Sequence, residues 1–119
     1  MIAKDFTLGI DIGSTTVKIA ILDPSYKIMF ADYRRHHADI QGTLRALVQD
    51  AHEKLGDITV HPVITGSGGL TLATHLQVPF VQEVVSVSTA LEKIAPKTDV
   101  AIELGGEDAK IIYFENGSI

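Results

Sequence analysis

Two segments of this chain place an acidic residue, a glycine turn and a lysine in the same order. The first reads Asp-Ile-Gly-Ser-Thr-Thr-Val-Lys over residues 11–18, and the second reads Glu-Leu-Gly-Gly-Glu-Asp-Ala-Lys over residues 103–110. Each acidic residue ends an apolar stretch, and each lysine lies at the start of the next one. This repeated pattern predicts two β-hairpins whose polar turns could hold a charged ligand.

The first turn contains the residue types that bind a phosphate group. Gly13 lets the backbone approach a ligand closely, and successive backbone N–H groups in such a turn can surround an anion. Ser14, Thr15 and Thr16 add hydroxyl donors. Lys18 can bring a positive charge to a β- or γ-phosphate. The pattern is not a P-loop, because Gly-x-x-x-x-Gly-Lys-[Ser/Thr] is absent. The alternative is an ordinary hairpin turn.

Asp11 and Glu103 are the candidates for the metal and for the chemistry. Each closes an apolar strand just before a glycine turn, where it could hold Mg²⁺ directly or through water. Gly105 and Gly106 would allow the second turn the same close approach to phosphate. Acidic residues on both sides of a nucleotide suit metal-assisted attack on a phosphoanhydride. We therefore predict catalytic and metal-binding roles for Asp11 and Glu103, with a solvated acidic turn as the alternative for the second segment.

The elements that must position these turns follow from hydrophobic periodicity. Residues 7–12, 16–22 and 27–34 are predicted to form three antiparallel strands. Apolar residues at spacings of three and four over residues 40–55 predict an amphipathic helix, with Asp39 as its N-cap and Gly56 after its last turn. The other predicted elements are a strand at 60–65, a short helix at 70–76, an edge strand at 78–82, a helix at 84–94, and strands at 100–104 and 110–114.

Composition narrows the function classes. The 119 residues include 45% hydrophobic and 21% charged residues, which argues against disorder. A net charge of −5 disfavours a nucleic-acid partner. No apolar run reaches the roughly 20 residues of a membrane helix, and the first residues lack a signal-peptide core. We therefore expect a cytoplasmic protein with neither a membrane nor a nucleic acid as partner.

The chain resembles the BadF/BadG/BcrA/BcrD-type ATPases, the activators of 2-hydroxyacyl-CoA dehydratases and benzoyl-CoA reductases. The resemblance rests on residues 9–18, 65–68, 82–84 and 103–110. The first segment is typical of the superfamily of actin, sugar kinases and heat-shock chaperones. The last is close to the activators' Asp-Ile-Gly-Gly-Gln-Asp-Ser-Lys and is specific to that family.

The resemblance implies an α/β fold built from ribonuclease H-like lobes. Residues 1–97 would form the first nucleotide-binding lobe, a mixed five-stranded sheet with flanking helices. Residues 98–119 would be the start of a second, truncated lobe. ATP and Mg²⁺ would bind between the lobes, and hydrolysis would drive an electron into a partner dehydratase or reductase. The residues that would contact phosphate and Mg²⁺ are Asp11, Ser14, Thr15, Thr16 and Lys18, faced by Glu103, Gly105 and Gly106.

The chain departs from the family at its metal cluster. Small activators hold one [4Fe–4S] cluster across a homodimer through cysteines, but this chain contains no cysteine. Ser86 stands where one cluster ligand is expected, and a serine is a poor substitute for a thiolate. Either cysteines elsewhere in a longer protein hold the cluster, or the protein does not carry the electron. Glu103 also replaces the usual aspartate, and Ser67 and Gly69 replace the usual tyrosine and arginine.

Two other functions stay open from the sequence. A small-molecule kinase of the same superfamily, acting on a sugar or an acyl acid, would share residues 11–18 and need an acceptor pocket. A non-catalytic interaction module would keep the fold without turnover. Among the remaining polar residues, we interpret His36 and His37 as strand-end groups rather than a metal site. We interpret Glu83 as a charge favoured by a helix N-terminus rather than as a buried anchor.

Overall fold

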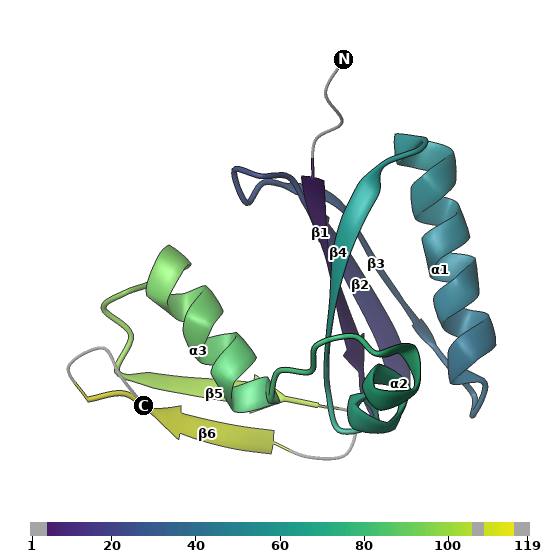
Figure 1. The fold of residues 1–119 in the computed structure, drawn as a ribbon. Helices are drawn as coiled ribbons and strands as arrows, with labels where there is room; N and C mark the ends of the chain where they lie inside the picture. The colour runs from purple at the N-terminus through teal and green to yellow at the C-terminus, as the bar shows by residue number, and fades with distance from the viewer. Residues whose placement is uncertain (1–4, 106–108, 116–119) are drawn as a thin grey trace.

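The computed structural model describes residues 5–105 and 109–115, and a four-stranded sheet forms its centre (Figure 1). The strand order is β3-β2-β1-β4. Its strands are β1 (Asp5–Ile12), β2 (Thr16–Leu22), β3 (Ile28–Arg35) and β4 (Thr59–Thr65). The first three form an antiparallel meander, and β4 pairs with β1 in parallel. The sheet is therefore mixed, and the turn after β1 lies at the same end of the sheet as the end of β4.

Alternation of apolar residues in β1 and β2 builds the core. Leu8, Ile10 and Ile12 of β1 are buried, and so are the residues opposite them in β2. The helix α1 (Ile40–Leu55) packs onto this face with Leu47 and Ala51. The core thus fixes the strand end that carries the first turn.

The predicted ends of α1 are confirmed. The Asp39 side chain accepts a hydrogen bond from the Gly42 N–H, as an N-cap does. Gly56 follows the helix with a φ of 75° and a ψ of −159°, a backbone conformation that is essentially restricted to glycine. The other predicted elements that form are placed within about two residues of their observed bounds.

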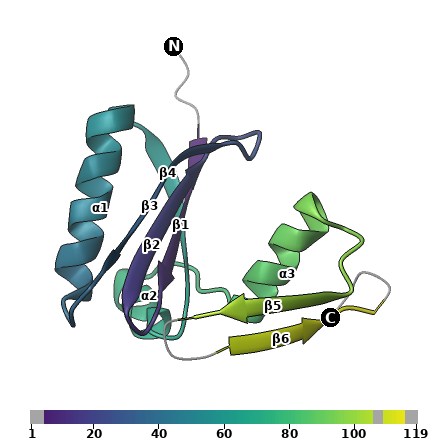
Figure 2. The ribbon, with the colours of Figure 1, turned by 180° about the vertical axis from the view of Figure 1, so that it is seen from behind.

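A second, two-stranded sheet lies apart from the first. After α2 (Gly69–Leu76) the chain forms α3 (Glu83–Ile94) and then an antiparallel hairpin of β5 (Val100–Leu104) and β6 (Ala109–Tyr113). Figures 1 and 2 show α1 on one side of the four-stranded sheet, and α3 with the β5–β6 hairpin on the other side.

The described residues contain no helix long and apolar enough to cross a membrane.

The fifth strand predicted over residues 78–82 is reduced to a single bridge. Phe80 bridges Ile64 in parallel, supported by hydrogen bonds of 2.9 Å from the Ile64 N–H to the Pro79 carbonyl and from the Val81 N–H to the Ile64 carbonyl. Pro79 has no N–H to extend the ladder, and α3 begins at Glu83. The predicted five-stranded sheet is therefore corrected to four strands and a bridge.

Candidate functional site

Asp11 and Lys18 lie directly opposite each other across the first hairpin, β1–β2. Thr65 is the neighbour of Asp11 on its other side, in β4. The connection consists of Gly13, Ser14 and Thr15, which we call the phosphate turn. Within it Ser14 is exposed and the other two residues are half-buried. The strand pairing thus places a carboxylate, a lysine and a turn with two hydroxyls at one end of the sheet.

The space beside Asp11 depends on Gly66. Its φ of 101° lies in the region that side chains rarely adopt, and a Cβ added there would lie 2.3 Å from the Ile12 carbonyl oxygen and 2.5 Å from Asp11 Oδ1. The Gly68 N–H donates to the same Ile12 carbonyl at 2.9 Å. The glycines of the 65–68 segment therefore let the loop after β4 close against Asp11.

Burial and three charges set the protonation of Asp11. Burial raises the pKa of its carboxyl above the ordinary value of 3.8, the positive charge of Lys18 lowers this pKa, the negative charge of Glu83 raises it, and Lys110 lowers it. Since burial is the largest cause, the net pKa is raised. Asp11 is thus a partly desolvated carboxylate that a bound cation would favour in its charged form.

The second hairpin, β5–β6, repeats the geometry of the first. Glu103 lies directly opposite Lys110, and the two are separated in sequence by the same interval as Asp11 and Lys18. Glu103 is half-buried and Gly105 is exposed beside it. Gly106, also predicted to contact phosphate, lies outside the described residues. Because Lys110 acts on the pKa of Asp11, the structure brings charges of both hairpins together.

Glu83 is a member of this cluster that sequence reasoning underrated. It is the first residue of α3, as predicted for a charge at a helix N-terminus, but its Oε2 also lies 3.0 Å from the Lys110 Nζ. Only 21% of the Glu83 side chain and 32% of the Lys110 side chain are exposed. The partner lies on a distant strand, so no local spacing reveals it. The only hint in the sequence that Glu83 belongs to the site was that segment 82–84 forms part of the resemblance to the activators.

Ser86 and Thr65 connect α3 to the end of β4. The Ser86 hydroxyl donates to the Thr65 hydroxyl oxygen at 3.3 Å. Thr65 is in turn the register neighbour of Asp11. Ser86, where the resemblance led us to expect a cluster ligand, is therefore a hydroxyl that faces another hydroxyl.

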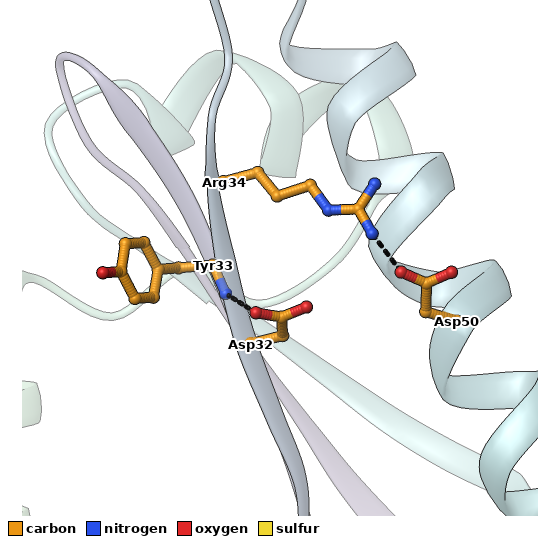
Figure 3. A network of polar contacts seen from close by, with 4 residues as sticks. All are labelled: Asp32, Tyr33, Arg34 and Asp50. Atoms are coloured by element: carbon orange, nitrogen blue, oxygen red, sulfur yellow. Dashed lines mark hydrogen bonds and ion pairs between the residues drawn. The ribbon is translucent and has the colours of Figure 1, made fainter.

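His36 is a second residue that sequence reasoning missed. Its backbone N–H donates to the Thr15 carbonyl at 3.0 Å, and its ring Nε2 lies 3.1 Å from the Gly13 carbonyl oxygen. The strand end before it is tied to α1 by an ion pair between Arg34 and Asp50, shown in Figure 3. As predicted, His36 lies at the end of a strand, but it also contacts the phosphate turn.

The described residues hold no group of three or more histidine, cysteine, aspartate or glutamate side chains placed to bind a metal together. A cation at this site would therefore take at most two carboxylate or imidazole ligands from the residues described. Mg²⁺ is commonly bound in this way, with waters and phosphate oxygens completing its coordination. The carboxylates and lysines of the two hairpins suit a ligand that combines a cation with phosphate groups.

Comparisons with known proteins find similar sequences and similar folds. No protein-family model matches the chain. The chain is 29% identical over 117 residues to the (R)-2-hydroxyglutaryl-CoA dehydratase activating ATPase of Acidaminococcus fermentans. The aligned region covers 96% of this chain and 44% of that protein. The crystal structure of component A of that dehydratase matches with a TM-score of 0.76 and 27% identity, again covering 96% of this chain and 44% of that one.

A second solved structure is the activator of the 2-hydroxyisocaproyl-CoA dehydratase from Clostridium difficile with bound ADPNP. It matches with a TM-score of 0.71 and 25% identity, covering 96% of this chain and 43% of that chain. These likenesses confirm the predicted actin-like ATPase fold and the resemblance to the dehydratase activators. The chain spans less than half the length of the relatives it matches.

Proposed function

We propose that this chain, a homologue of the activating ATPases of 2-hydroxyacyl-CoA dehydratases, forms one side of an ATP site whose hydrolysis activates a partner dehydratase or reductase. The observation that carries the proposal is the repeated cross-strand pair, Asp11 with Lys18 and Glu103 with Lys110. Two lysines and two carboxylates at the ends of two hairpins suit a Mg²⁺-bound polyphosphate. The electrostatic interaction of Lys110 with Asp11 supports a common site.

The phosphates of the nucleotide are assigned to the two turns. Gly13, Ser14 and Thr15, together with the Thr16 hydroxyl, would donate to one side, and Lys18 would supply the charge. Gly105 and Gly106 would approach from the other side. Positioning and charge neutralisation provide most of the catalysis in phosphoryl transfer, so a rigid pair of turns is the main requirement.

Magnesium fits the donor set. Asp11 is a partly desolvated carboxylate. The neighbouring position 66 is a glycine, and any side chain there would collide with Asp11 Oδ1. Mg²⁺ prefers carboxylate and phosphate oxygens and needs few protein ligands. Asp11 and Glu103, directly or through water, would hold the cation. Bound there, it would neutralise charge on the phosphate oxygens during attack.

An iron–sulfur cluster does not fit the residues of this chain. The chain offers no thiolate, and the Ser86 hydroxyl faces that of Thr65. We therefore assign to these residues the handling of the nucleotide and no step of electron transfer. The electron transfer to a partner, and a homodimer, are proposals that concern the longer protein.

The domain boundary near residue 98 is also a proposal. The β5–β6 hairpin forms its own sheet, and alternate residues turn one apolar face of it to solvent. The exposed members of this face are Val100, Ile102, Leu104, Ile111 and Tyr113. Contiguous exposed apolar patches commonly mark a surface that another part of a protein covers. This supports residues 98–119 as the start of a second lobe that would complete the nucleotide site.

The test is Mg-ATP turnover by the full-length protein, with and without sugar or short acyl-acid acceptors. Slow hydrolysis that ignores acceptors and is lost in Asp11→Asn supports the activator function. Turnover that requires an acceptor would instead assign the protein to the small-molecule kinases. Tight binding without hydrolysis would leave a non-catalytic interaction module.

A further inference from the structure

We infer that His36 is a positioning residue of the nucleotide site, whose imidazole orients the phosphate turn for a phosphate group. The inference rests on the proposed function. It adds a residue that lies outside the repeated acidic, glycine and lysine pattern, after the end of β3. Three hydrogen bonds define its role.

The first two bonds hold the turn itself. The backbone N–H of His36 donates to the Thr15 carbonyl at 3.0 Å, and its Nε2 lies 3.1 Å from the Gly13 carbonyl oxygen. One residue therefore binds two carbonyls of the phosphate turn. In a planar trans peptide the C=O and the following N–H point in opposite directions. Holding these carbonyls toward β3 directs the N–H groups of Ser14 and Thr16 away from it.

The third bond identifies the donor. The Ala38 N–H donates to the His36 Nδ1 at 3.1 Å, so Nδ1 accepts and the proton of the neutral ring is on Nε2. The Nε2–H therefore donates to the Gly13 carbonyl. His37 and Ala38 both have positive φ, of 46° and 65°, which turns the chain back so that the Ala38 N–H reaches the ring. Residues held in this region cost conformational energy, which is typical of a constrained functional loop.

The ring also changes the hydrogen bonding of the turn. The Gly13 N–H donates to the Thr16 carbonyl at 2.9 Å. In the described part of the chain the Gly13 carbonyl accepts from the His36 ring and not from the Thr16 N–H. A hairpin in which two residues, here Ser14 and Thr15, lie between the bonded pair usually closes with both bonds. By taking the Gly13 carbonyl, His36 leaves the Thr16 N–H to a ligand, which is the arrangement an anion-binding turn needs.

The test compares His36→Ala, His36→Gln and His37→Asn in the full-length protein. Glutamine keeps an N–H donor at the end of its side chain, whereas alanine removes it. His37→Asn changes the neighbouring exposed histidine and tolerates its positive φ. The readouts are the Kd for Mg-ADPNP by calorimetry, hydrogen exchange of the turn amides without nucleotide, and the Tm.

We expect His36→Ala to raise the Kd about tenfold, the usual effect of one lost hydrogen bond at a binding site. His36→Gln should recover most of this affinity, and His37→Asn should bind like the wild type. In His36→Ala the turn amides should exchange about tenfold faster. Unchanged affinity in His36→Ala, or equal losses in alanine and glutamine variants with a matching fall in Tm, would overturn the inference. A wild type that binds no Mg-ADPNP would overturn the proposed function as well.

Discussion

At the scale of single residues, Asp11 carries its charge where burial opposes it. Its pKa is raised by burial, and Glu83 adds to this rise, while Lys18 and Lys110 offset part of it. A group whose folded pKa exceeds its unfolded value stabilises the fold fully below the unfolded pKa, and this stabilisation is lost as pH rises through the folded pKa. The protein thus keeps a carboxylate that weakens its fold near neutral pH.

Asp11→Asn should therefore raise the free energy of unfolding at pH 7, because the amide never has to carry a buried charge. The gain should shrink at pH values below the pKa of Asp11, where the wild-type carboxyl is protonated. A series of denaturant unfolding experiments from pH 7 down to pH 3 measures both. The same variant should lose Mg-nucleotide binding, as expected when a strained site is relieved at the expense of function. Equal stability of the two proteins at pH 7 would contradict the effect of burial.

Gly66→Ala tests the space beside Asp11. A methyl group there would meet the Ile12 carbonyl and the Asp11 carboxylate, and φ is 101°. We expect a loss of about 2 kcal/mol or more in the free energy of unfolding. Gly56→Ala is the matched control, since Gly56 also has a positive φ of 75° but no atom within 4 Å of the added Cβ. Its backbone, with ψ of −159°, is strained for any side chain and should cost about 1–3 kcal/mol, and Gly66→Ala should cost more because the clash is added. Equal losses at both positions would show that Gly66 is required for its φ alone.

At the scale of elements, the Glu83–Lys110 ion pair joins the start of α3 to β6. The pair is mostly buried and lies beside Asp11, so it connects the second hairpin to the charge of the first. Ser86 adds a hydroxyl contact between α3 and β4. Through these contacts α3 reaches the second hairpin at Lys110 and the end of β4 beside Asp11.

Glu83→Gln should lower the pKa of Asp11. The substitution removes a negative charge that raises this pKa and keeps the positive charge of Lys110, which lowers it. The lost ion pair should also reduce the free energy of unfolding by about 1–3 kcal/mol, because the pair is mostly buried. An NMR titration of the Asp11 carboxyl measures the pKa, and Glu92→Gln on the exposed side of the same helix is the control. If the pKa of Asp11 stays the same in both variants, the charge of Glu83 does not act on Asp11 and Glu83 is not part of the site.

The elements themselves were largely predictable, whereas the contacts between them were not. Alternating apolar residues and glycine turns identified both hairpins, and Asp39 and Gly56 marked the ends of α1. The strand predicted over residues 78–82 was wrong in extent because Pro79 cannot donate to a ladder. The roles of Glu83 and His36 depend on partners far along the chain, at Lys110 and Gly13. Such pairs arise only when the sheet order brings the segments together.

At the scale of the whole molecule, the exposed apolar face of the β5–β6 hairpin is the surface that we assign to the proposed second lobe. Ile102 is 65% exposed at the centre of this face, opposite Ile111. The relatives are more than twice as long as this chain, so the proposed second lobe would be large enough to cover this face. The 119-residue chain alone would keep this face in water.

Ile102→Lys should then act oppositely in the two forms of the protein. In the isolated 119-residue chain it should reduce self-association and binding of a hydrophobic dye, because it breaks the apolar patch. In the full-length protein it should lower the Tm by several degrees, because a lysine would be buried. Ile28→Lys, at 62% exposure on β3, should be tolerated in both. Tolerance of Ile102→Lys in the full-length protein would contradict a second lobe on this face.

The central claim is that the two hairpins bind one Mg-nucleotide, and calorimetric titration of the full-length protein with Mg-ADPNP tests it most directly. The variants are Lys18→Met in the first hairpin and Lys110→Met in the second, with Lys27→Met as an exposed control. We predict that each of the first two raises the Kd at least tenfold, through loss of a charge-assisted contact to phosphate. The control should bind like the wild type. Wild-type affinity in both Lys18→Met and Lys110→Met would contradict the claim.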